Sequence, residues 1–336
     1  MGELRQANII GTGCYLPEKK LTNADLEKMV DTSDEWIITR SGIKERRIAA
    51  SDQKVSDMAV EAAKMALKNA NIEPEKIGAV ILASFTQDRL ISSTACVIQQ
   101  KLGCKNAAAF DIEVACSGFV YGVTIGKNFI ATGMYDYVLV IGADILSRVI
   151  DFTDRTTCVL FGDGAGAVAL GPSTGSEGIF DTLLGADGSG AEHITIPAGG
   201  SAMPTTAQTV ADRMHYVKIN GKEVFKFSTK IVGDMIDQVL TRNNVKLADV
   251  KLIIPHQANI RIIESAAKRF ECDMEKFYVN IDRYGNTVAA TIPIGLHEAL
   301  AEGRIKEGDI VLLAGFGGGL TWGLVAMRWG KTKVTA

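Results

Sequence analysis

The stretch FDIEVACSGFVYGV, residues 110–123, places two hydrophobic patterns on either side of one cysteine. Residues 110–114 predict a short strand, and apolar side chains at helical spacing between 119 and 130 predict a helix beginning near Gly118. Cys116 therefore lies at a strand-to-helix turn, where unpaired backbone N–H groups and the positive end of the helix dipole stabilise an anion. A thiol in this place is expected to have a lowered pKa and to act as a nucleophile.

A buried structural cysteine is the alternative interpretation of Cys116, because free cysteines are among the most buried residues in proteins. Its neighbours Ala115, Ser117 and Gly118 are small and leave room for a substrate to approach the sulfur. This local composition favours a nucleophile over a structural cysteine.

The composition of the whole chain restricts the class of protein. Its 336 residues, 47% of them hydrophobic, can bury a large core and suggest about two domains or one duplicated domain. A formal net charge of −3 argues against general nucleic-acid binding. No apolar run approaches the roughly 20 residues that span a bilayer, and the N-terminal residues show no signal-peptide pattern. We therefore expect a cytoplasmic protein without membrane insertion.

The cysteines and glycines give no sign of a bound metal or nucleotide cofactor. The six cysteines form no CxxC pair and no cluster with histidine at metal-site spacing, as expected for free thiols in a reducing compartment. FGDGAGAVAL (161–170) has the glycines of a weak dinucleotide-binding fingerprint, but a strand-like segment follows where that fingerprint needs a helix.

Buried strands alternate with amphipathic helices along the chain. Helices are expected at about 56–69 and 227–243. Strands buried on both faces are predicted at 79–83, 138–141, 251–254 and 310–314. This alternation predicts a layered α/β fold.

An internal repeat connects the two parts of the chain. KMALKNANIEPEKIGAVILA (64–83) and DQVLTRNNVKLADVKLIIPH (237–256) share a helix, an asparagine-containing stop and a buried strand, with Asn71 aligned to Asn244. The segments 117–143 and 290–316 match in the same order, which favours duplication. We expect two halves at 1–175 and 176–336. A loop at about 185–212 is expected to form a lid, a partner surface or an active-site wall.

Three further segments carry residues suited to catalysis. His256 ends a predicted strand, at the edge where α/β folds build their sites. Asn286 precedes a helix that the repeat equates with the helix after Cys116. The glycine-rich GFGGGLTWG (315–323) can present backbone N–H groups to an oxyanion. A structural histidine, a helix-capping asparagine and a plain tight turn are the alternatives.

Two features are suited to binding. Trp36 and Arg40 fall four residues apart on one face of a short predicted helix and can grip a heterocycle such as adenine. Basic side chains recur at helical spacing in 222–230 and cluster in 261–269, where they can dock an acidic partner. A tryptophan packed under an arginine stem and solvated helix faces are the alternatives.

Taken in order, these segments resemble the β-ketoacyl-acyl-carrier-protein synthase III family, the initiating condensing enzymes of type II fatty-acid synthesis. The resemblance spans essentially the whole chain and implies a duplicated thiolase-type α/β fold. In that fold the layers run α-β-α-β-α with two related mixed sheets, and the family works as a homodimer. The motifs that carry it are DTSDEWIITRSGIKERRIA (31–49), ACSGFVYG (115–122), FGDGAGA (161–167), HQANIRI (256–262), YGNTVAATIPIGL (284–296) and GFGGGLTWG (315–323).

The resemblance implies a catalytic triad of Cys116, His256 and Asn286. Cys116 would accept an acyl group from acyl-CoA, which then condenses with malonyl-acyl carrier protein as CO2 is lost. His256 and Asn286 would stabilise the enolate, and the N–H groups of Cys116 and Gly318 would form the oxyanion hole. The family needs no metal or redox cofactor, and acyl-CoA is a substrate rather than a cofactor.

The resemblance also assigns residues to the two carriers of acyl groups. Arg261 would help to dock the acidic carrier protein, for which the basic residues at helical spacing also suggest Lys226. Contacts with CoA would come from Thr32, Trp36, Arg40, Arg155 and Asn259.

Two positions depart from the family pattern. Val288 stands where many members have serine, a change that we expect to be mild. Ile91 stands where acetyl-preferring members place a phenylalanine that reaches the acyl pocket of the partner subunit. A differently shaped pocket would accept longer or branched primers, so the sequence leaves the primer open.

Three other functions fit parts of the pattern. A related thiolase-fold condensing or acyl-transfer enzyme of secondary metabolism would use the same triad. A cysteine hydrolase would release free acid, whereas a condensing enzyme keeps its acyl group until malonyl arrives. An acyl-CoA-binding homologue without activity would need no intact triad.

Overall fold

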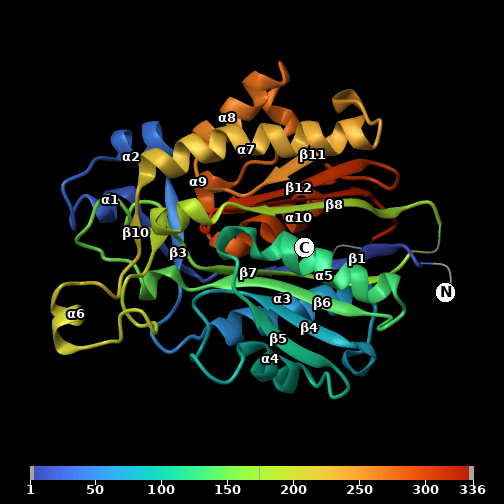
Figure 1. The fold of residues 1–336 in the computed structure, drawn as a ribbon, viewed down its shortest axis with the longest axis horizontal. Helices are drawn as coiled ribbons and strands as arrows, with labels where there is room; N and C mark the ends of the chain where they lie inside the picture. The colour runs from blue at the N-terminus through green and yellow to red at the C-terminus, as the bar shows by residue number, and fades with distance from the viewer. Residues whose placement is uncertain (1–3, 174, 333–336) are drawn as a thin grey trace.

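The computed structural model describes residues 4–173 and 175–332 and contains two mixed β-sheets (Figure 1). The first has the order β1 (Ala7–Tyr15), β7 (Gly164–Pro172), β6 (Val138–Asp144), β4 (Ala79–Ala83) and β5 (Ala108–Ile112). The second has the order β11 (Val250–Pro255), β12 (Ile310–Gly317), β13 (Thr321–Arg328) and β8 (Gly178–Ala186). Strand β4 is parallel to β5 and β6, β11 is parallel to β12, and the other pairs are antiparallel.

Helices form three layers around the two sheets. Helices α5 (Gly118–Ala131) and α10 (Thr291–Ala301) lie between the sheets and contact both of them. Helices α3 (Val55–Ala70) and α4 (Thr94–Leu102) cover the outer face of the first sheet. Helices α7 (Gly221–Arg242) and α8 (Ile260–Arg269) cover the second (Figure 1). The predicted α-β-α-β-α layering is therefore confirmed.

Smaller elements lie outside these layers. A hairpin of β2 (Lys19–Thr22) and β3 (Glu45–Ile48) flanks α1 (Asn23–Leu26) and α2 (Asp34–Ser41). A short ladder joins β9 (Ile194–Thr195) to β10 (Lys218–Ile219), and α6 (Ala207–Ala211) projects between them from the body of the molecule (Figure 1). Helix α9 (Ile281–Tyr284) precedes α10.

The duplication is visible in the backbone. Asn71 and Asn244, which the sequence repeat aligns, both adopt left-handed conformations, with φ of 54° and 53°. Ala115 and Val288, the same number of residues apart, have φ of 42° and 52°, and each opens a 3-10 turn before α5 or α10. The two sheets draw their strands from 7–172 and 178–328. The division into halves at 175 remains a prediction.

Most predicted elements are present with shifted ends. Helix α3 runs one residue further at each end than predicted, and α7 begins six residues earlier, where Asn220 accepts a hydrogen bond from the Glu223 N–H. Strand β5 ends at Ile112 rather than Val114, because the chain turns there toward the 3-10 helix Ala115–Ser117. The ends of such elements depend on tertiary contacts as well as on the local hydrophobic pattern, so they differ from the predicted ends by a few residues.

The apolar core has a central layer between the sheets and separate layers under α3 and α4 on one side and under α7 and α8 on the other. Residues of α5 and α10 such as Phe119, Val123 and Leu296 pack with inward-facing residues of both sheets, including Val140 and Leu313. Across the described ranges, no helix is long and apolar enough to cross a membrane.

Gly142 allows β6 to lie directly against the turn before α10. A Cβ atom at this position would stand 2.3 Å from the Ala289 carbonyl oxygen. We predict that Gly142→Ala lowers the free energy of unfolding by about 1–3 kcal/mol, because neither backbone can give way. Gly188→Ala, whose Cβ meets nothing within 4 Å, should change it by less than about 0.5 kcal/mol. Denaturant titration of both variants measures the difference, and equal stabilities would contradict this account.

Candidate active site

Cys116 occupies the centre of the turn between β5 and α5. It lies in the 3-10 helix Ala115–Ser117, directly before the first residue of α5, and is 8% exposed. The strand-to-helix turn predicted from the sequence is therefore confirmed. The preceding residue, Ala115, has a left-handed backbone conformation with φ of 42°, which non-glycine residues rarely adopt.

A cavity of about 550 Å³ opens onto Cys116. It brings together five residues predicted to act at one site: Cys116, His256, Asn286, Gly318 and Asn259. Its apolar wall is formed by Phe85, Leu146, Leu160, Phe161, Ile194, Ile196, Val217 and Ile219. Four of these wall residues, at 194, 196, 217 and 219, come from the segment between β8 and α7, so this segment, which includes the predicted loop at 185–212, forms part of the cavity wall.

The predicted lowering of the Cys116 pKa is wrong for the resting protein. Burial, together with the negative charges of Asp144 and Glu113, raises the pKa of Cys116 to about 12. The backbone N–H groups of Cys116 and Gly318 point at the sulfur and offset only part of this effect. Desolvation outweighs the helix terminus here because a buried thiolate loses its hydration.

His256 lies one residue beyond β11 and is 1% exposed. Its Nδ1 atom is 2.7 Å from the Thr291 hydroxyl, and its ring meets the Phe316 ring edge to face at 5.2 Å between centroids. Burial lowers the pKa of His256 to about 3, so the imidazole is neutral at physiological pH. The Thr291 hydroxyl also lies 3.1 Å from the Val288 carbonyl, so its one proton goes either to that carbonyl or to Nδ1, and only the second arrangement leaves the ring proton on Nε2.

Asn286 is held by the backbone on both sides. Its N–H donates to the Leu160 carbonyl at 2.9 Å, and its carbonyl accepts from the Gly162 N–H at 3.0 Å. Its side-chain Oδ1 accepts from the Val288 N–H at 2.9 Å. Because Oδ1 is engaged in this way, the Nδ2 group is the one available as a donor to a ligand in the cavity.

The turn between β12 and β13 closes the cavity beside the cysteine. Gly317 packs so closely that a Cβ atom there would stand 2.7 Å from the Cys116 Cβ. Gly318 follows, and its N–H lies close enough to the Cys116 sulfur to lower the thiol pKa. Two backbone donors therefore converge where an acyl oxygen on Cys116 would lie.

A second group of predicted residues gathers at α2. The guanidinium groups of Arg40 and Arg155 lie 5.7 and 5.4 Å from the centre of the Trp36 ring. Asn259 caps α8 and donates from Nδ2 to the Arg40 carbonyl at 2.9 Å, which connects this group to the cavity that Asn259 also lines. The buried Thr32 hydroxyl has no hydrogen-bond partner in the described structure.

Three predicted residues lie outside both the cavity and the group at α2. Ile91 is 85% exposed, beside the equally exposed Leu90, in the segment before α4. Arg261 and Lys226 are exposed on α8 and α7, two helices that pack against each other. Within a single chain, Ile91 therefore does not reach the cavity at Cys116.

The sequence interpretation missed several residues of the site. Thr291 lies in the quoted motif YGNTVAATIPIGL, at the first turn of α10, but nothing in the pattern indicated its contact with His256. Glu113 lines the cavity and accepts from the Ala115 N–H at 3.1 Å. Val288, which the sequence singled out only as a departure from the family pattern, also lines it in a left-handed conformation that is costly for a β-branched residue. No described cluster of three or more His, Cys, Asp or Glu side chains could hold a metal ion.

The raised pKa predicts slow reaction of the free thiol. With a pKa of about 12, roughly one Cys116 in 10⁴ is ionised at pH 8. Alkylation of Cys116 by iodoacetamide, followed by peptide mass spectrometry, should therefore accelerate about tenfold per pH unit between pH 6 and 9. Alkylation of the exposed Cys96 in the same samples controls for the reagent. A rate that levels off below pH 8 would show a resting thiolate instead.

Comparisons with known proteins identify the family. Two sequence models of 3-oxoacyl-[acyl-carrier-protein] synthase III match residues 110–188 and, for its C-terminal part, 240–329. The β-ketoacyl-[acyl-carrier-protein] synthase III of Caldanaerobacter subterraneus subsp. tengcongensis is 53% identical over 98% of this chain and 100% of its own length.

Solved structures agree with these sequence matches. The 3-oxoacyl-[acyl-carrier-protein] synthase III of Aquifex aeolicus VF5 superposes with a TM-score of 0.89 at 48% identity, over 96% of this chain and 100% of that one. The priming β-ketosynthase of the R1128 polyketide pathway gives a TM-score of 0.91 at 30% identity, over 98% of both chains. The chain therefore belongs to the β-ketoacyl-acyl-carrier-protein synthase III family and has its duplicated thiolase-type fold.

Proposed function

We propose that this protein condenses an acyl-CoA primer with malonyl-acyl carrier protein, giving 3-ketoacyl-acyl carrier protein, CoA and CO2. This reaction is the first elongation step of fatty-acid biosynthesis. One observation carries the proposal: a thiol, a neutral imidazole, an amide donor and two converging backbone N–H groups line a single apolar cavity. Together they supply the nucleophile and both sets of oxyanion donors that the reaction needs.

In the first half-reaction the Cys116 sulfur attacks the thioester carbonyl of acyl-CoA. The developing oxyanion is held by the N–H groups of Cys116 and Gly318, which point toward the sulfur. The C–S bond to CoA breaks, and the proton that leaves Cys116 ends on the CoA sulfur. Since the resting thiol is protonated, ionisation accompanies attack rather than preceding it.

In the second half-reaction malonyl-acyl carrier protein enters the emptied site. Its C–C bond to the carboxylate breaks, CO2 leaves, and the electron pair forms an enolate. Neutral His256, through Nε2–H, and Asn286, through Nδ2–H, donate to the enolate oxygen. The enolate carbon attacks the acyl carbonyl on Cys116, the C–S bond breaks, and the cysteine regains a proton.

The cluster at α2 is proposed to bind CoA. The adenine ring would stack on Trp36 between the guanidinium groups of Arg40 and Arg155, which also attract phosphates. The resemblance also assigns to CoA binding Thr32, whose hydroxyl is buried without a hydrogen-bond partner in the described structure and would have to be uncovered to meet the nucleotide. Asn259, at the cavity entrance, would hold the pantetheine arm.

Carrier protein and partner subunit are assigned to exposed surfaces. Arg261 and Lys226, on adjacent helices, would receive the acidic carrier protein. The exposed apolar pair Leu90 and Ile91 is suited to a homodimer interface, through which Ile91 would reach the acyl pocket of the other subunit. Ile91 would leave room there for longer or branched primers. The reaction requires no cofactor, and we propose that it takes place in the cytoplasm.

A condensing enzyme of secondary metabolism is the second candidate. The polyketide priming enzyme has the same fold but is only 30% identical to this chain, whereas relatives named synthase III reach 53%. The fatty-acid reaction is therefore favoured.

Intact-protein mass spectrometry tests the reaction directly. The protein is mixed with straight-chain and branched acyl-CoAs and then chased with malonyl-acyl carrier protein. We expect one acyl mass on Cys116, absent in Cys116→Ala, and its discharge as 3-ketoacyl product. Discharge as free acid without malonyl would support a hydrolase. No adduct with any acyl-CoA would contradict the proposal.

The two donors are tested in separate half-reactions. His256→Ala and Asn286→Ala should each slow release of CO2 from malonyl-acyl carrier protein by about 10²–10³-fold, the usual cost of one oxyanion donor. Acylation of Cys116 should change much less, because its oxyanion is held by backbone N–H groups. Equal slowing of both half-reactions would contradict the assigned roles.

Removal of the stacking ring should affect only substrates that contain adenine. We expect Trp36→Ala to raise KM for acyl-CoA about tenfold with kcat nearly unchanged, since stacking on a base contributes about 1–3 kcal/mol. The matched control is an acyl-pantetheine substrate, which lacks the nucleotide. Its KM should not change in the variant, and an equal rise for both substrates would place CoA elsewhere.

A further inference from the structure

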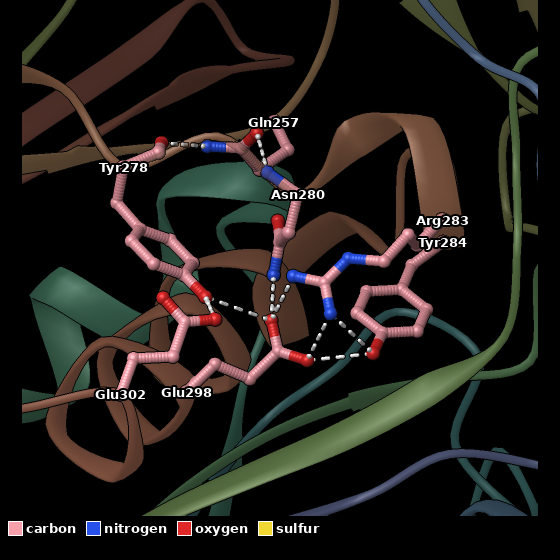
Figure 2. Close-up of polar contacts among 7 residues, drawn as sticks. All are labelled: Gln257, Tyr278, Asn280, Arg283, Tyr284, Glu298 and Glu302. Carbon is pink, nitrogen blue, oxygen red and sulfur yellow. Dashed lines mark hydrogen bonds and ion pairs between the residues drawn. The ribbon is translucent and has the colours of Figure 1, made fainter. Parts of the chain in front are cut away.

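A polar cluster joins chain segments that adjoin His256 and Asn286, and its residues lie outside the described cavity lining. Figure 2 shows its seven residues, which come from three parts of the chain: Gln257, Tyr278, Asn280, Arg283, Tyr284, Glu298 and Glu302. None of them lines the cavity or takes part in the chemistry proposed above. Their contacts nevertheless join the segments that carry both enolate donors.

Glu298, on α10, is the centre of the cluster (Figure 2). Its carboxylate accepts hydrogen bonds from the Tyr284 hydroxyl at 2.6 Å and from Asn280 Nδ2 at 2.8 Å. It also forms an ion pair with Arg283, with 3.0 Å between Nη2 and Oε2. A weaker contact comes from the Tyr278 hydroxyl at 3.3 Å. One carboxylate thus holds four side chains of the segment 278–284.

The same segment holds the residue after His256. Gln257 is 1% exposed and donates from Nε2 to the Tyr278 carbonyl at 3.0 Å. Its Oε1 accepts from the Asn280 backbone N–H at 3.2 Å. The position of the His256 backbone therefore depends on residues 278 and 280.

The segment also leads directly to the other donor. Helix α9 ends at Tyr284, and Gly285 alone separates it from Asn286. Arg283 and Tyr284 are the last two residues of α9, and the guanidinium of one and the hydroxyl of the other both donate hydrogen bonds to Glu298. A shift of this helix would therefore move the Asn286 backbone with it.

The charges of the cluster favour a single arrangement. The Glu298 side chain is 15% exposed, so its interactions are only weakly screened by water. Burial and the nearby Glu298 carboxylate raise the pKa values of Tyr278 and Tyr284, which keeps both phenols as donors. A buried carboxylate with several donors and one cation is costly to disturb, because any lost partner leaves charge unpaired.

We propose that Glu298 is a positioning residue that holds His256 and Asn286 in register for the decarboxylation step. This inference rests on the enolate-stabilising roles proposed for those two residues. Cys116 and Gly318 are held by the turn before α5 and by the β12–β13 turn, and no described hydrogen bond joins them to the cluster. Disturbing Glu298 should therefore slow the second half-reaction and spare the first.

Glu298→Gln tests this proposal with a side chain of the same shape. The amide removes the negative charge opposite Arg283 and one of the two acceptor atoms. We expect release of CO2 from malonyl-acyl carrier protein to slow about 10–100-fold, the range expected for a small misplacement of catalytic groups. The rate of Cys116 acylation by acyl-CoA, followed by intact-protein mass spectrometry, should stay within about twofold.

Glu302→Gln is the matched control. Glu302 lies one turn further along the chain and accepts from Tyr278 alone, at 2.8 Å. This variant should leave both half-reactions unchanged. Tyr284→Phe, which removes a single hydrogen bond to Glu298, should give a smaller loss that is again confined to decarboxylation. It keeps the test open if Glu298→Gln does not fold.

Two results would overturn the proposal. The first is a Glu298→Gln enzyme that folds and decarboxylates at the normal rate. The second is equal slowing of both half-reactions, which indicates a general structural role. His256→Ala, measured in parallel, separates this test from the proposed function. If His256→Ala decarboxylates normally, the donor assignment fails; if it is slow while Glu298→Gln is normal, only the positioning role fails.

Discussion

The close approach of the two turns that open α5 and α10, in the middle of the molecule, is the constraint on which the site depends. One turn carries Cys116 before α5, and the other carries Asn286 before α10. The turns can pack against the neighbouring strands because Gly142 on β6 and Gly317 on β12 have no side chain. A Cβ atom at Gly142 would clash with the Ala289 carbonyl, and one at Gly317 would clash with Cys116. Ala115 and Val288 adopt left-handed conformations at equivalent points, and such local strain persists where surrounding structure enforces it.

Burial at this meeting point sets the electrostatic character of the site. The same loss of hydration raises the pKa of Cys116 and lowers that of His256, so the resting site contains a neutral thiol and a neutral imidazole. A neutral imidazole suits hydrogen-bond donation to an enolate. In the proposed reaction, charge forms only once substrate has filled the apolar cavity and brought its carbonyl to the backbone N–H groups.

Much of the fold and of the site could be predicted from the sequence. Alternating buried strands and amphipathic helices indicated the layered fold, and the alignment of Asn71 with Asn244 indicated the duplication that the backbone angles display. Motif order indicated the family. Thr291 and Glu298 were missed, because a single threonine or glutamate on a helix forms no recognisable sequence motif. Their roles depend on partners that lie 35 residues away for Thr291 and up to 20 residues away for Glu298, and only folding brings these together.

The sequence by itself determined the family, the fold class and the identity of the residues offered for chemistry, since periodicity and motif order depend on neighbours along the chain. Only the tertiary structure decided the ionisation state of Cys116. A helix terminus is a local feature that favours a thiolate, whereas desolvation depends on every segment packed around the sulfur. Tertiary structure likewise decided which residues contact the segments of the proposed donors, because α10 meets the His256 and Asn286 segments only in the folded protein.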